Sequence, residues 1–436
     1  MFPSHLGGVI PLSPRAIGKR VATALGAACA LTVALTACSP DVSVPLDTAP
    51  QVDAPFDEAL TAQLQDAATH AMAAAGAPGA VVGVWAPWSG SWVTALGVQD
   101  PATGEAIDPD AAFRVGQLTR PMTCDVLYAV ADEGRVALDA KVSEHVPGAA
   151  DVGEVTLEQL CDGTSGIGGY AGQLSGQWTN NPERRWDPRE LAAYGLGQPR
   201  TGEPGAAYRG SDAGYVLLGL ALERITGQSA ASLIEQYVAD PLDLTGTQLP
   251  PAGQKEPSDG AVLEGHIPVN GPDGALNCAQ PQPFSVLSSS AGYTDAGAVS
   301  NVEDLHRYVQ ALAIGALTPD DTDRFADAKP VYDGAPSWFT TAGGALLAGS
   351  LVGQSGSVPG YATAAFSDPN SGLTVVVALN SSATGANIAQ SLAWELAAIA
   401  SKAPATGGDA APEAGLPWTA DQFRQAIAEA AVCPVP

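Results

Sequence analysis

Basic residues are scarce in this chain, which has 19 Lys and Arg against 46 Asp and Glu and a formal net charge of −27. A surface with this balance repels phosphate backbones and anionic lipid head groups, which argues against nucleic acid and charged lipid as direct partners. The acidic residues are scattered along the chain and form no tail, which indicates a solvated surface.

Recognisable metal and phosphate sites are also missing from the sequence. None of the five His lies at ligand spacing from a Cys, so the sequence predicts no zinc site. The glycine-rich segments lack the spacing of a phosphate-binding loop, and no segment repeats along the chain. We therefore expect no metal, no cofactor and no repeat architecture.

The N-terminal segment has the pattern of a secretory signal. Three basic residues precede an apolar run over 21–37 that is too short for a stable membrane span. The run ends in LTAC at 35–38, which resembles a bacterial lipobox. We expect residues 1–37 to be removed and Cys38 to carry lipid, which places the exported chain on the outer face of the cell membrane. The alternative is an ordinary cleaved signal that leaves Cys38 free.

The rest of the chain divides into three parts by composition. Residues 38–57 are rich in Pro, Asp, Val and Ser without helical or strand periodicity, and are predicted to form a lipid-anchored flexible spacer. Residues 58–402 are long enough for one large domain. Residues 403–436 contain a linker rich in Pro, Gly and Ala and a last helix with Cys433 at its end.

Hydrophobic periodicity predicts strands near both ends of the domain, with helices between them. The expected helices are 60–75, 121–133, 157–161, 215–225, 230–237, 305–314, 388–401 and 419–432. The expected strands are 80–85, 91–98, 345–351, 361–367 and 373–380. This order indicates an α+β fold in which one sheet is built from both ends of the chain.

Six segments of the domain carry motifs in a recognisable order. The first, AFRVGQLTRPMT at 112–123, is similar to F-R-x-G-S-x-T-K-P-x-T. The others lie at 155–167, 204–227, 240–247, 290–305 and 352–361, the last reading VGQSGSVPGY. Together they resemble the serine β-lactamase and penicillin-binding family, in its class C β-lactamase, D-alanyl-D-alanine carboxypeptidase and esterase branch. The resemblance implies a five-stranded antiparallel sheet flanked by terminal helices, plus an all-helical subdomain, with a cleft between them.

The residues that would carry the family's chemistry are changed in this chain. The resemblance implies a serine nucleophile and, three residues later, a lysine that helps to remove the serine proton. Here these positions hold Gln117 and Arg120. A carboxamide is no nucleophile, and a guanidinium keeps its proton at any working pH, so Arg120 cannot act as a base.

The second and third motifs are degenerate as well. The tyrosine and asparagine positions of the second motif hold Gly210 and Asp212. In the third, Gln354 replaces the family's Lys or His and is followed by Ser355 and Gly356. We therefore expect no intact catalytic residue and a polar cleft lined by these degenerate positions.

Arg120 indicates what such a cleft binds. A guanidinium can hold a carboxylate through two hydrogen bonds, so a peptidoglycan peptide terminus or another small carboxylate is the expected ligand. The alternative for Arg120 is an internal salt bridge, with Asp212 as the expected partner.

Four Cys remain after the leader is removed and Cys38 is lipidated. An even number in an exported protein favours two disulfides, with three possible pairings. Cys124 and Cys161 belong to segments that approach each other in the family's fold. The resemblance therefore implies Cys124–Cys161, which leaves Cys278–Cys433.

The leading hypothesis is a catalytically silent, ligand-binding module on the cell surface. One alternative is an active hydrolase with a relocated nucleophile, for which Cys124, Ser211 and Ser355 are candidates. Thr119 is not a candidate, because it lies about 200° round the helix from Gln117 and faces away from the cleft. The other alternative is a protein-binding accessory lipoprotein with a vestigial cleft.

Overall fold

The computed structural model describes residues 43–149, 152–272, 274–406 and 411–435. The predicted signal sequence and Cys38 lie outside these residues. Within the described ranges, no helix is both long enough and apolar enough to cross a membrane.

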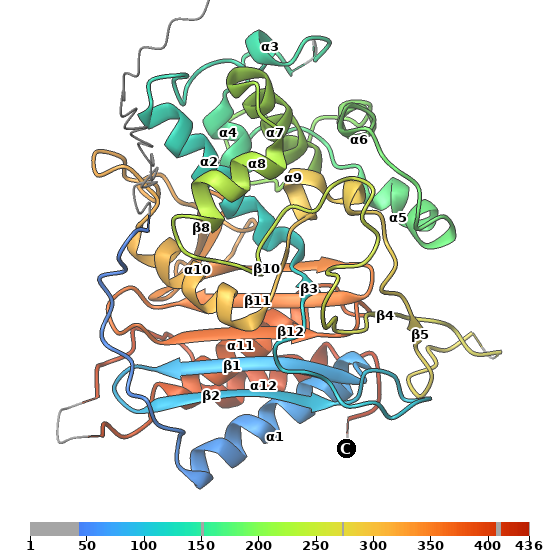
Figure 1. Ribbon diagram of the computed structural model, residues 1–436, viewed down its shortest axis with the longest axis vertical. Helices are drawn as coiled ribbons and strands as arrows, with labels where there is room; N and C mark the ends of the chain where they lie inside the picture. The colour runs from blue at the N-terminus through green and yellow to red at the C-terminus, as the bar shows by residue number, and fades with distance from the viewer. Residues whose placement is uncertain (1–42, 150–151, 273, 407–410, 436) are drawn as a thin grey trace, which may run out of the picture. The chain divides into compact units, whose positions relative to one another are not determined.

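An antiparallel sheet runs through the structure (Figure 1). Its strands are, in spatial order, β2 (Gly90–Gly97), β1 (Gly79–Ala86), β12 (Thr374–Leu379), β11 (Tyr361–Ser367), β10 (Leu351–Val358), β9 (Ala345–Ala348), β8 (Phe339–Ala342) and β7 (Lys329–Pro330). The N-terminal β1 pairs with the C-terminal β12, with Gly83 opposite Val376. This confirms that both ends of the chain build one sheet.

The sheet has eight strands, so the prediction of five is wrong in number. The short strands β7, β8 and β9 extend its edge. Gly343 and Gly344 form the tight turn between β8 and β9, with φ of +54° and +77°, values that glycine adopts without strain. Gly349, at φ +58°, turns the chain between β9 and β10. The apolar run expected to form one strand over 345–351 is therefore divided between two.

Helices cover both faces of the sheet (Figure 1). On one face, α1 (Glu58–Ala75), α11 (Asn387–Ala400) and α12 (Ala420–Glu429) share a core that includes Leu64 and Trp394. On the other face, α10 (Val302–Ile314) contributes to a second core together with the helical region. The centre of the sheet is buried on both sides, which explains why β12 is apolar from Val375 to Leu379.

The helical region lies between β2 and β7 in the sequence. Its helices are α2 (Thr119–Asp132), α3 (Val142–His145), α4 (Leu157–Cys161), α5 (Ala171–Asn180), α6 (Pro188–Leu196), α7 (Asp212–Thr226), α8 (Ala230–Ile234) and α9 (Tyr293–Ala296). The π-helical turn η3 (Glu235–Ala239) continues α8. Two small sheets complete this region, formed by β3 (Phe113–Arg114) with β6 (Val299–Ser300) and by β4 (His266–Ile267) with β5 (Gln282–Pro283). The sequence predicted α2, α4, α7 and α8 and missed the others.

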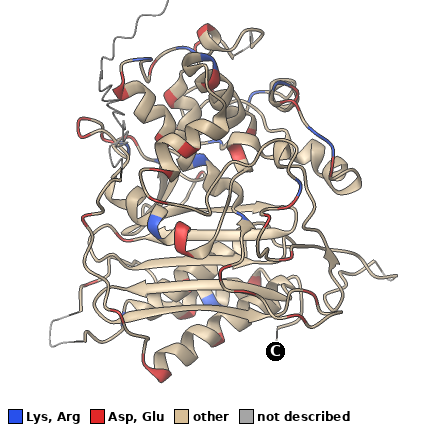
Figure 2. Ribbon diagram, in the orientation of Figure 1, with Lys and Arg blue, Asp and Glu red and all other residues tan. Residues whose placement is uncertain are grey.

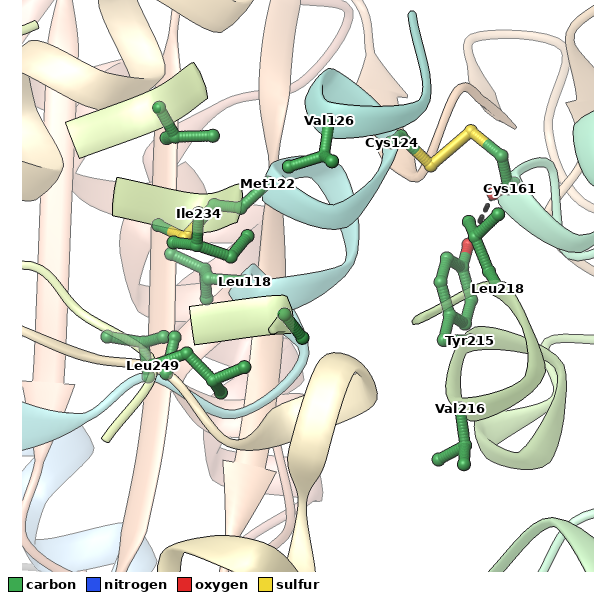
Figure 3. Packing of buried hydrophobic residues seen from close by; sticks show 14 of the residues in the cluster. Leu118, Met122, Cys124, Val126, Cys161, Tyr215, Val216, Leu218, Ile234 and Leu249 are labelled. Carbon is green, nitrogen blue, oxygen red and sulfur yellow. Dashed lines mark hydrogen bonds between the residues drawn. A yellow bond between two sulfur atoms is a disulfide. The ribbon is translucent and has the colours of Figure 1, made fainter. Parts of the chain in front are cut away.

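Two disulfides fasten these elements. Cys124 in α2 is bonded to Cys161 in α4, with Cα atoms 5.5 Å apart (Figure 3). Cys278 is bonded to Cys433, which follows α12. Both pairings implied by the family resemblance are confirmed. Cys124 therefore has no free thiol in this structure and is not available as a displaced nucleophile.

The segment expected to be a flexible spacer follows the body closely from residue 43 onwards. The Val44 N–H donates a hydrogen bond to the Pro241 carbonyl at 2.7 Å, and the Phe56 N–H donates to the Ser91 carbonyl at 3.3 Å. Val44 and Leu46 also pack against the core. The prediction of a free coil is wrong for this part, because alternate apolar residues of an extended chain bury one face of it.

Acidic side chains are spread over the structure (Figure 2). Asp and Glu occur on the helices above the sheet, on the loops beside it and on the helices behind it. Basic side chains are fewer, in keeping with the composition. This distribution is typical of a solvated acidic surface and indicates no acidic tract with a separate role.

Candidate ligand pocket

Gln117 lies in a short 3₁₀ turn, Gly116–Leu118, that leads directly into α2. The turn packs tightly against β10, because a Cβ on Gly356 would lie only 2.4 Å from the backbone nitrogen of Gln117. This close approach places the Gln117 side chain beside the β10 backbone. Its Oε1 accepts a hydrogen bond from the Ser357 N–H at 2.7 Å.

The Ser357 N–H is a chemically significant donor. A fixed backbone N–H at the wall of a pocket can stabilise negative charge that develops on a carbonyl oxygen during acyl transfer. Here the carbonyl oxygen of the Gln117 side chain already occupies that donor. An incoming carbonyl group would have to displace the Gln117 carboxamide before it could use the same hydrogen bond.

Arg120 follows one helical turn later and forms a buried ion pair. Its Nε lies 2.8 Å from Oδ1 of Asp295, and the two side chains are only 12% and 3% exposed. The guanidinium also lies 4.7 Å from the ring centre of Tyr215 and 3.5 Å from the hydroxyl of Tyr208. The internal salt bridge considered for Arg120 is therefore present, but its partner is Asp295. The prediction that Asp212 would be the partner is wrong.

Asp212 is held by backbone donors instead. It is the first residue of α7, and its Oδ1 accepts a hydrogen bond from the Tyr170 N–H at 2.7 Å. Its Oδ2 accepts from the Ala171 N–H at 2.8 Å. Both donors lie at the start of α5, where unpaired N–H groups and the helix dipole favour a carboxylate. The carboxylate of Asp212 therefore stabilises two helix ends.

Burial and pairing set the protonation of the Arg120–Asp295 pair. Burial raises the pKa of Asp295 to about 6, against the opposing effect of the Arg120 charge. Burial alone would lower the pKa of Arg120, but the Asp295 carboxylate together with the Tyr208 and Tyr215 side chains outweighs it and raises that pKa above its ordinary value. At pH 7 the Asp295 carboxyl is therefore deprotonated and the Arg120 guanidinium is protonated, so both groups are charged. Arg120 consequently cannot accept a proton there.

A small pocket with a cavity volume of about 60 Å³ opens beside Gln117. Its apolar and aromatic wall is formed by Tyr170, Ala171, Trp178, Leu287, Ala291, Ala296, Val358 and Pro359. Its other lining residues are Arg114, Gln117, Ser288, Ser289, Gly292, Asp295, Gly297 and Ser357. Among the site positions predicted from the sequence, Gln117 is the one that lines this pocket.

The third motif lies on β10, where neighbouring side chains point to opposite faces of the sheet. The Gln354 Nε2 donates a hydrogen bond to the Gly344 carbonyl at 2.8 Å. Ser355 points to the other face, and its Oγ donates to Oε1 of Gln390 on α11 at 2.7 Å. Ser355 therefore faces the terminal helices, and the expectation that it is a cleft hydroxyl is wrong.

The second motif also differs from the expected arrangement. A Cβ on Gly210 would lie 2.5 Å from the Tyr208 hydroxyl oxygen, so the Tyr208 side chain occupies the space that a side chain at 210 would need. Ser211 is the N-cap of α7, because its Oγ accepts a hydrogen bond from the Gly214 N–H at 3.0 Å. Ser211 is buried and is no cleft hydroxyl, contrary to expectation.

The serine hydroxyls that do line the pocket lack a base. The Ser289 Oγ donates to the Pro251 carbonyl at 2.6 Å, and the Ser288 Oγ lies 2.7 Å from the Ser290 Oγ. The Ser357 Oγ donates to a backbone carbonyl. In the described part of the chain, none of these hydroxyls is hydrogen-bonded to a Lys, His, Asp or Glu side chain. The pocket therefore contains no nucleophile–base pair of the kind that covalent catalysis uses.

Sequence reasoning missed three residues of this site. Asp295 is the one acidic residue in the run of small and apolar residues over 290–299, and an isolated acid in such a run is a signal of burial and pairing. Arg114 is part of the first motif but was not singled out. Trp178 lies on α5, which was not predicted. No group of three or more potential metal ligands occurs within the described ranges.

The chain is similar in sequence to a family model and to parts of known proteins. The family model described as Beta-lactamase matches residues 64–398. Protein flp of Staphylococcus aureus (strain N315) is 26% identical over 223 residues, which are 49% of this chain and 41% of that protein. Esterase EstB of Burkholderia gladioli is 29% identical over 163 residues, 34% of this chain and 41% of that protein. The matches thus span about two fifths of the length of each relative.

Solved structures share the fold. A D-stereospecific amidohydrolase from Streptomyces sp. superposes with a TM-score of 0.64 at 22% identity, covering 73% of this chain and 94% of that chain. The penicillin binding protein from Bacillus halodurans gives a TM-score of 0.59 at 19% identity, covering 75% and 95%. Because the family model matches most of the domain, the chain belongs to the Beta-lactamase family.

Proposed function

We propose that this chain is an exported lipoprotein whose Beta-lactamase-family domain binds a ligand and does not hydrolyse it. One observation carries the proposal. Gln117 stands at the nucleophile position of the first motif, and its carboxamide is hydrogen-bonded to the Ser357 N–H. The same side chain thus replaces the nucleophile and blocks a donor that catalysis would need.

Three requirements of acyl transfer are unmet around Gln117. A carboxamide does not attack a carbonyl group, and the charged Arg120 cannot take a proton. The Ser357 N–H is occupied. Loss of a serine nucleophile alone lowers kcat by about 10⁶-fold in subtilisin, and here the base is replaced as well.

The pocket nevertheless has the form of a ligand site. Tyr170 and Trp178 provide an aromatic wall, and Val358 and Pro359 add apolar surface. Sites of this kind take affinity from apolar burial and specificity from a few polar groups. A peptidoglycan peptide terminus or another small carboxylate is the ligand that we propose, by analogy with the penicillin binding protein of Bacillus halodurans. Arg120 is not available for that ligand, because it is paired with Asp295.

The proposed location follows from the leader sequence. Residues 1–37 and Cys38 lie outside the described residues, and their roles as signal and lipid anchor are part of the proposal. Because the chain from Val44 onwards is hydrogen-bonded to the body, a lipid on Cys38 would hold the domain close to the outer face of the membrane. A binding module in that position meets ligands released at the cell surface.

The alternative is an active hydrolase with a displaced nucleophile, but none of the three residues considered for that role is available. Cys124 is in a disulfide, Ser211 caps a helix, and Ser355 faces α11. No observation specifically favours the alternative of a protein-binding accessory role.

Calorimetric titration combined with mass spectrometry tests the proposal. The purified full-length chain in detergent is titrated with N-acylated amino acids and dipeptides and then analysed for cleaved product. We expect saturable binding and complete recovery of intact ligand. Trp178→Ala should weaken binding, whereas Trp92→Ala, on β2 and outside the pocket, should not. Product that accumulates in proportion to enzyme concentration would overturn the proposal.

A further inference from the structure

We infer that the pocket selects ligands that carry a carboxylate and that Arg114, in place of Arg120, recognises it. This inference rests on the proposed function, because it assumes that the pocket binds a small ligand without hydrolysing it. It names the chemical class of that ligand: a small carboxylic acid with an apolar or aromatic substituent. It also assigns a ligand-binding role to a residue of the first motif that no catalytic argument uses.

Arg114 is an unusual cation within this protein. It lies on β3, is 3% exposed and lines the pocket. Its Nη2 donates hydrogen bonds to the carbonyls of Lys255 at 2.6 Å and Leu287 at 2.5 Å. Its Nε is buried and has no hydrogen-bond partner within the described residues. Unlike Arg120, it forms no ion pair in the described part of the chain.

A buried guanidinium without an acidic partner carries a desolvation cost that no opposite charge offsets. Transfer of a charge out of water is costly, so buried cations are normally paired with an acid. Arginine does not escape the cost by losing its proton, even though burial lowers the pKa of Arg114. The two carbonyl groups satisfy part of its donor capacity but neutralise none of its charge. A carboxylate bound beside Arg114 would supply the missing negative charge.

The other charged groups of the pocket do not fill this role. Asp295 lines the same pocket, but its charge is matched by Arg120. Glu256 lies near enough to influence Arg114, yet it is exposed and forms no ion pair with it within the described ranges. Charge balance within the pocket therefore favours a ligand with one negative charge over a neutral or cationic one.

The rest of the lining defines the other half of the ligand. Tyr170, Trp178 and Leu287 offer aromatic and apolar surface to a hydrophobic substituent. An N-acylated aromatic amino acid combines these features, and its primary carboxamide is a matched ligand that lacks the charge.

The competing explanation is that Arg114 is purely structural, since it ties two loop carbonyls to β3. A comparison of acid with amide separates the two explanations. The full-length chain is titrated with both enantiomers of N-acetylphenylalanine and of N-acetylphenylalaninamide. We expect the wild type to prefer the acid at least about tenfold, as for a charged hydrogen bond in a desolvated site.

Variants at two arginines complete the experiment. Arg114→Gln should remove the preference for the acid and leave amide affinity within about twofold. Arg209→Gln, at an exposed ion pair with Asp333, should change neither affinity. Equal loss of acid and amide affinity in Arg114→Gln would show that Arg114 is structural and overturn the inference. If Arg114→Gln does not fold, equal binding of acid and amide by the wild type overturns it on its own.

The failures of the two proposals are distinguishable. Binding of acid and amide without preference and without cleavage would reject the carboxylate class and leave the non-catalytic function intact. Cleavage of the N-acyl bond would reject the proposed function itself.

Discussion

The side-chain oxygen of Gln117 accepts a hydrogen bond from the backbone N–H of Ser357 at 2.7 Å. These residues are 240 positions apart in the sequence and are brought together by the contact between the turn before α2 and strand β10. The hydrogen bond joins the first motif to the third. The proposed loss of acyl transfer in this Beta-lactamase-family fold rests on this contact.

Restoring the hydroxyl alone should not restore activity. Gln117→Ser returns a potential nucleophile and frees the Ser357 N–H. Arg120 remains charged beside Asp295, so the new hydroxyl has no base. We expect no ester turnover above that of the wild type in a chromogenic assay between pH 6 and 9. Turnover by this single variant would show that Arg120 is not the limiting defect.

Glu395 on α11 should make stability depend on pH. Its side chain is 2% exposed, and its Oε1 lies 3.6 Å from Nη1 of Arg424. Burial raises the pKa of Glu395 to about 7, more than Arg424 lowers it. A raised pKa favours the protonated native state, so the stability tied to this group is complete below pH 4.5, the unfolded value, and is lost as the pH rises to about 7.

Glu395→Gln should therefore leave stability nearly unchanged at pH 4.5. At pH 8 it should raise the free energy of unfolding by up to about 3 kcal/mol. Denaturant titrations of both proteins at the two pH values measure the difference. A gap that is the same at both values would contradict the assigned role of Glu395.

The Cys124–Cys161 disulfide should contribute strongly to stability. It closes a loop of sequence separation 37, for which the loop-entropy model gives about 4 kcal/mol. Cys124→Ala with Cys161→Ala should lower the free energy of unfolding by about that amount. The matched change at Cys278 and Cys433, whose separation is 155, should cost about 5 kcal/mol. Non-reducing peptide mapping that recovers Cys124 as a free thiol would contradict the pairing.

Membrane attachment should depend on Cys38. In cells fed a clickable fatty acid, the wild-type chain should be labelled and should sediment with membranes. Cys38→Ala should lose the label and appear in the soluble exported fraction, because the stable anchor is the lipid. Equal labelling of both proteins would place the lipid elsewhere or reject lipidation.

Much of the fold could be predicted because its signals are local. Short apolar runs located β1, β2, β11 and β12, and helical patterns located α1, α7, α10 and α11. The glycine at 227, at φ +75°, correctly marked the C-terminal end of α7. The edge strands β7 and β8 were missed because they are two and four residues long, too short for periodicity to show.

The site was less predictable, because its key contacts are between distant segments. The motif order identified Gln117 and Arg120 correctly as neighbours on one helical turn. The choice of Asp295 over Asp212 as the partner of Arg120 depends on which carboxylate the backbone leaves free. Asp212 is engaged by the N–H groups at the start of α5, a helix that the sequence analysis did not foresee. The hydrogen bond from Ser357 to Gln117 likewise depends on two chain segments that touch only in the folded state.

Covalent labelling of the pocket tests the absence of catalysis most directly. The purified full-length chain is incubated with a fluorescent penicillin, a chromogenic cephalosporin and a short-chain nitrophenyl ester, and its intact mass is measured. The account predicts no acyl adduct and no turnover above buffer, because Gln117 and Arg120 supply neither nucleophile nor base. A stoichiometric adduct, or turnover that substitution of a single Ser abolishes, would contradict it.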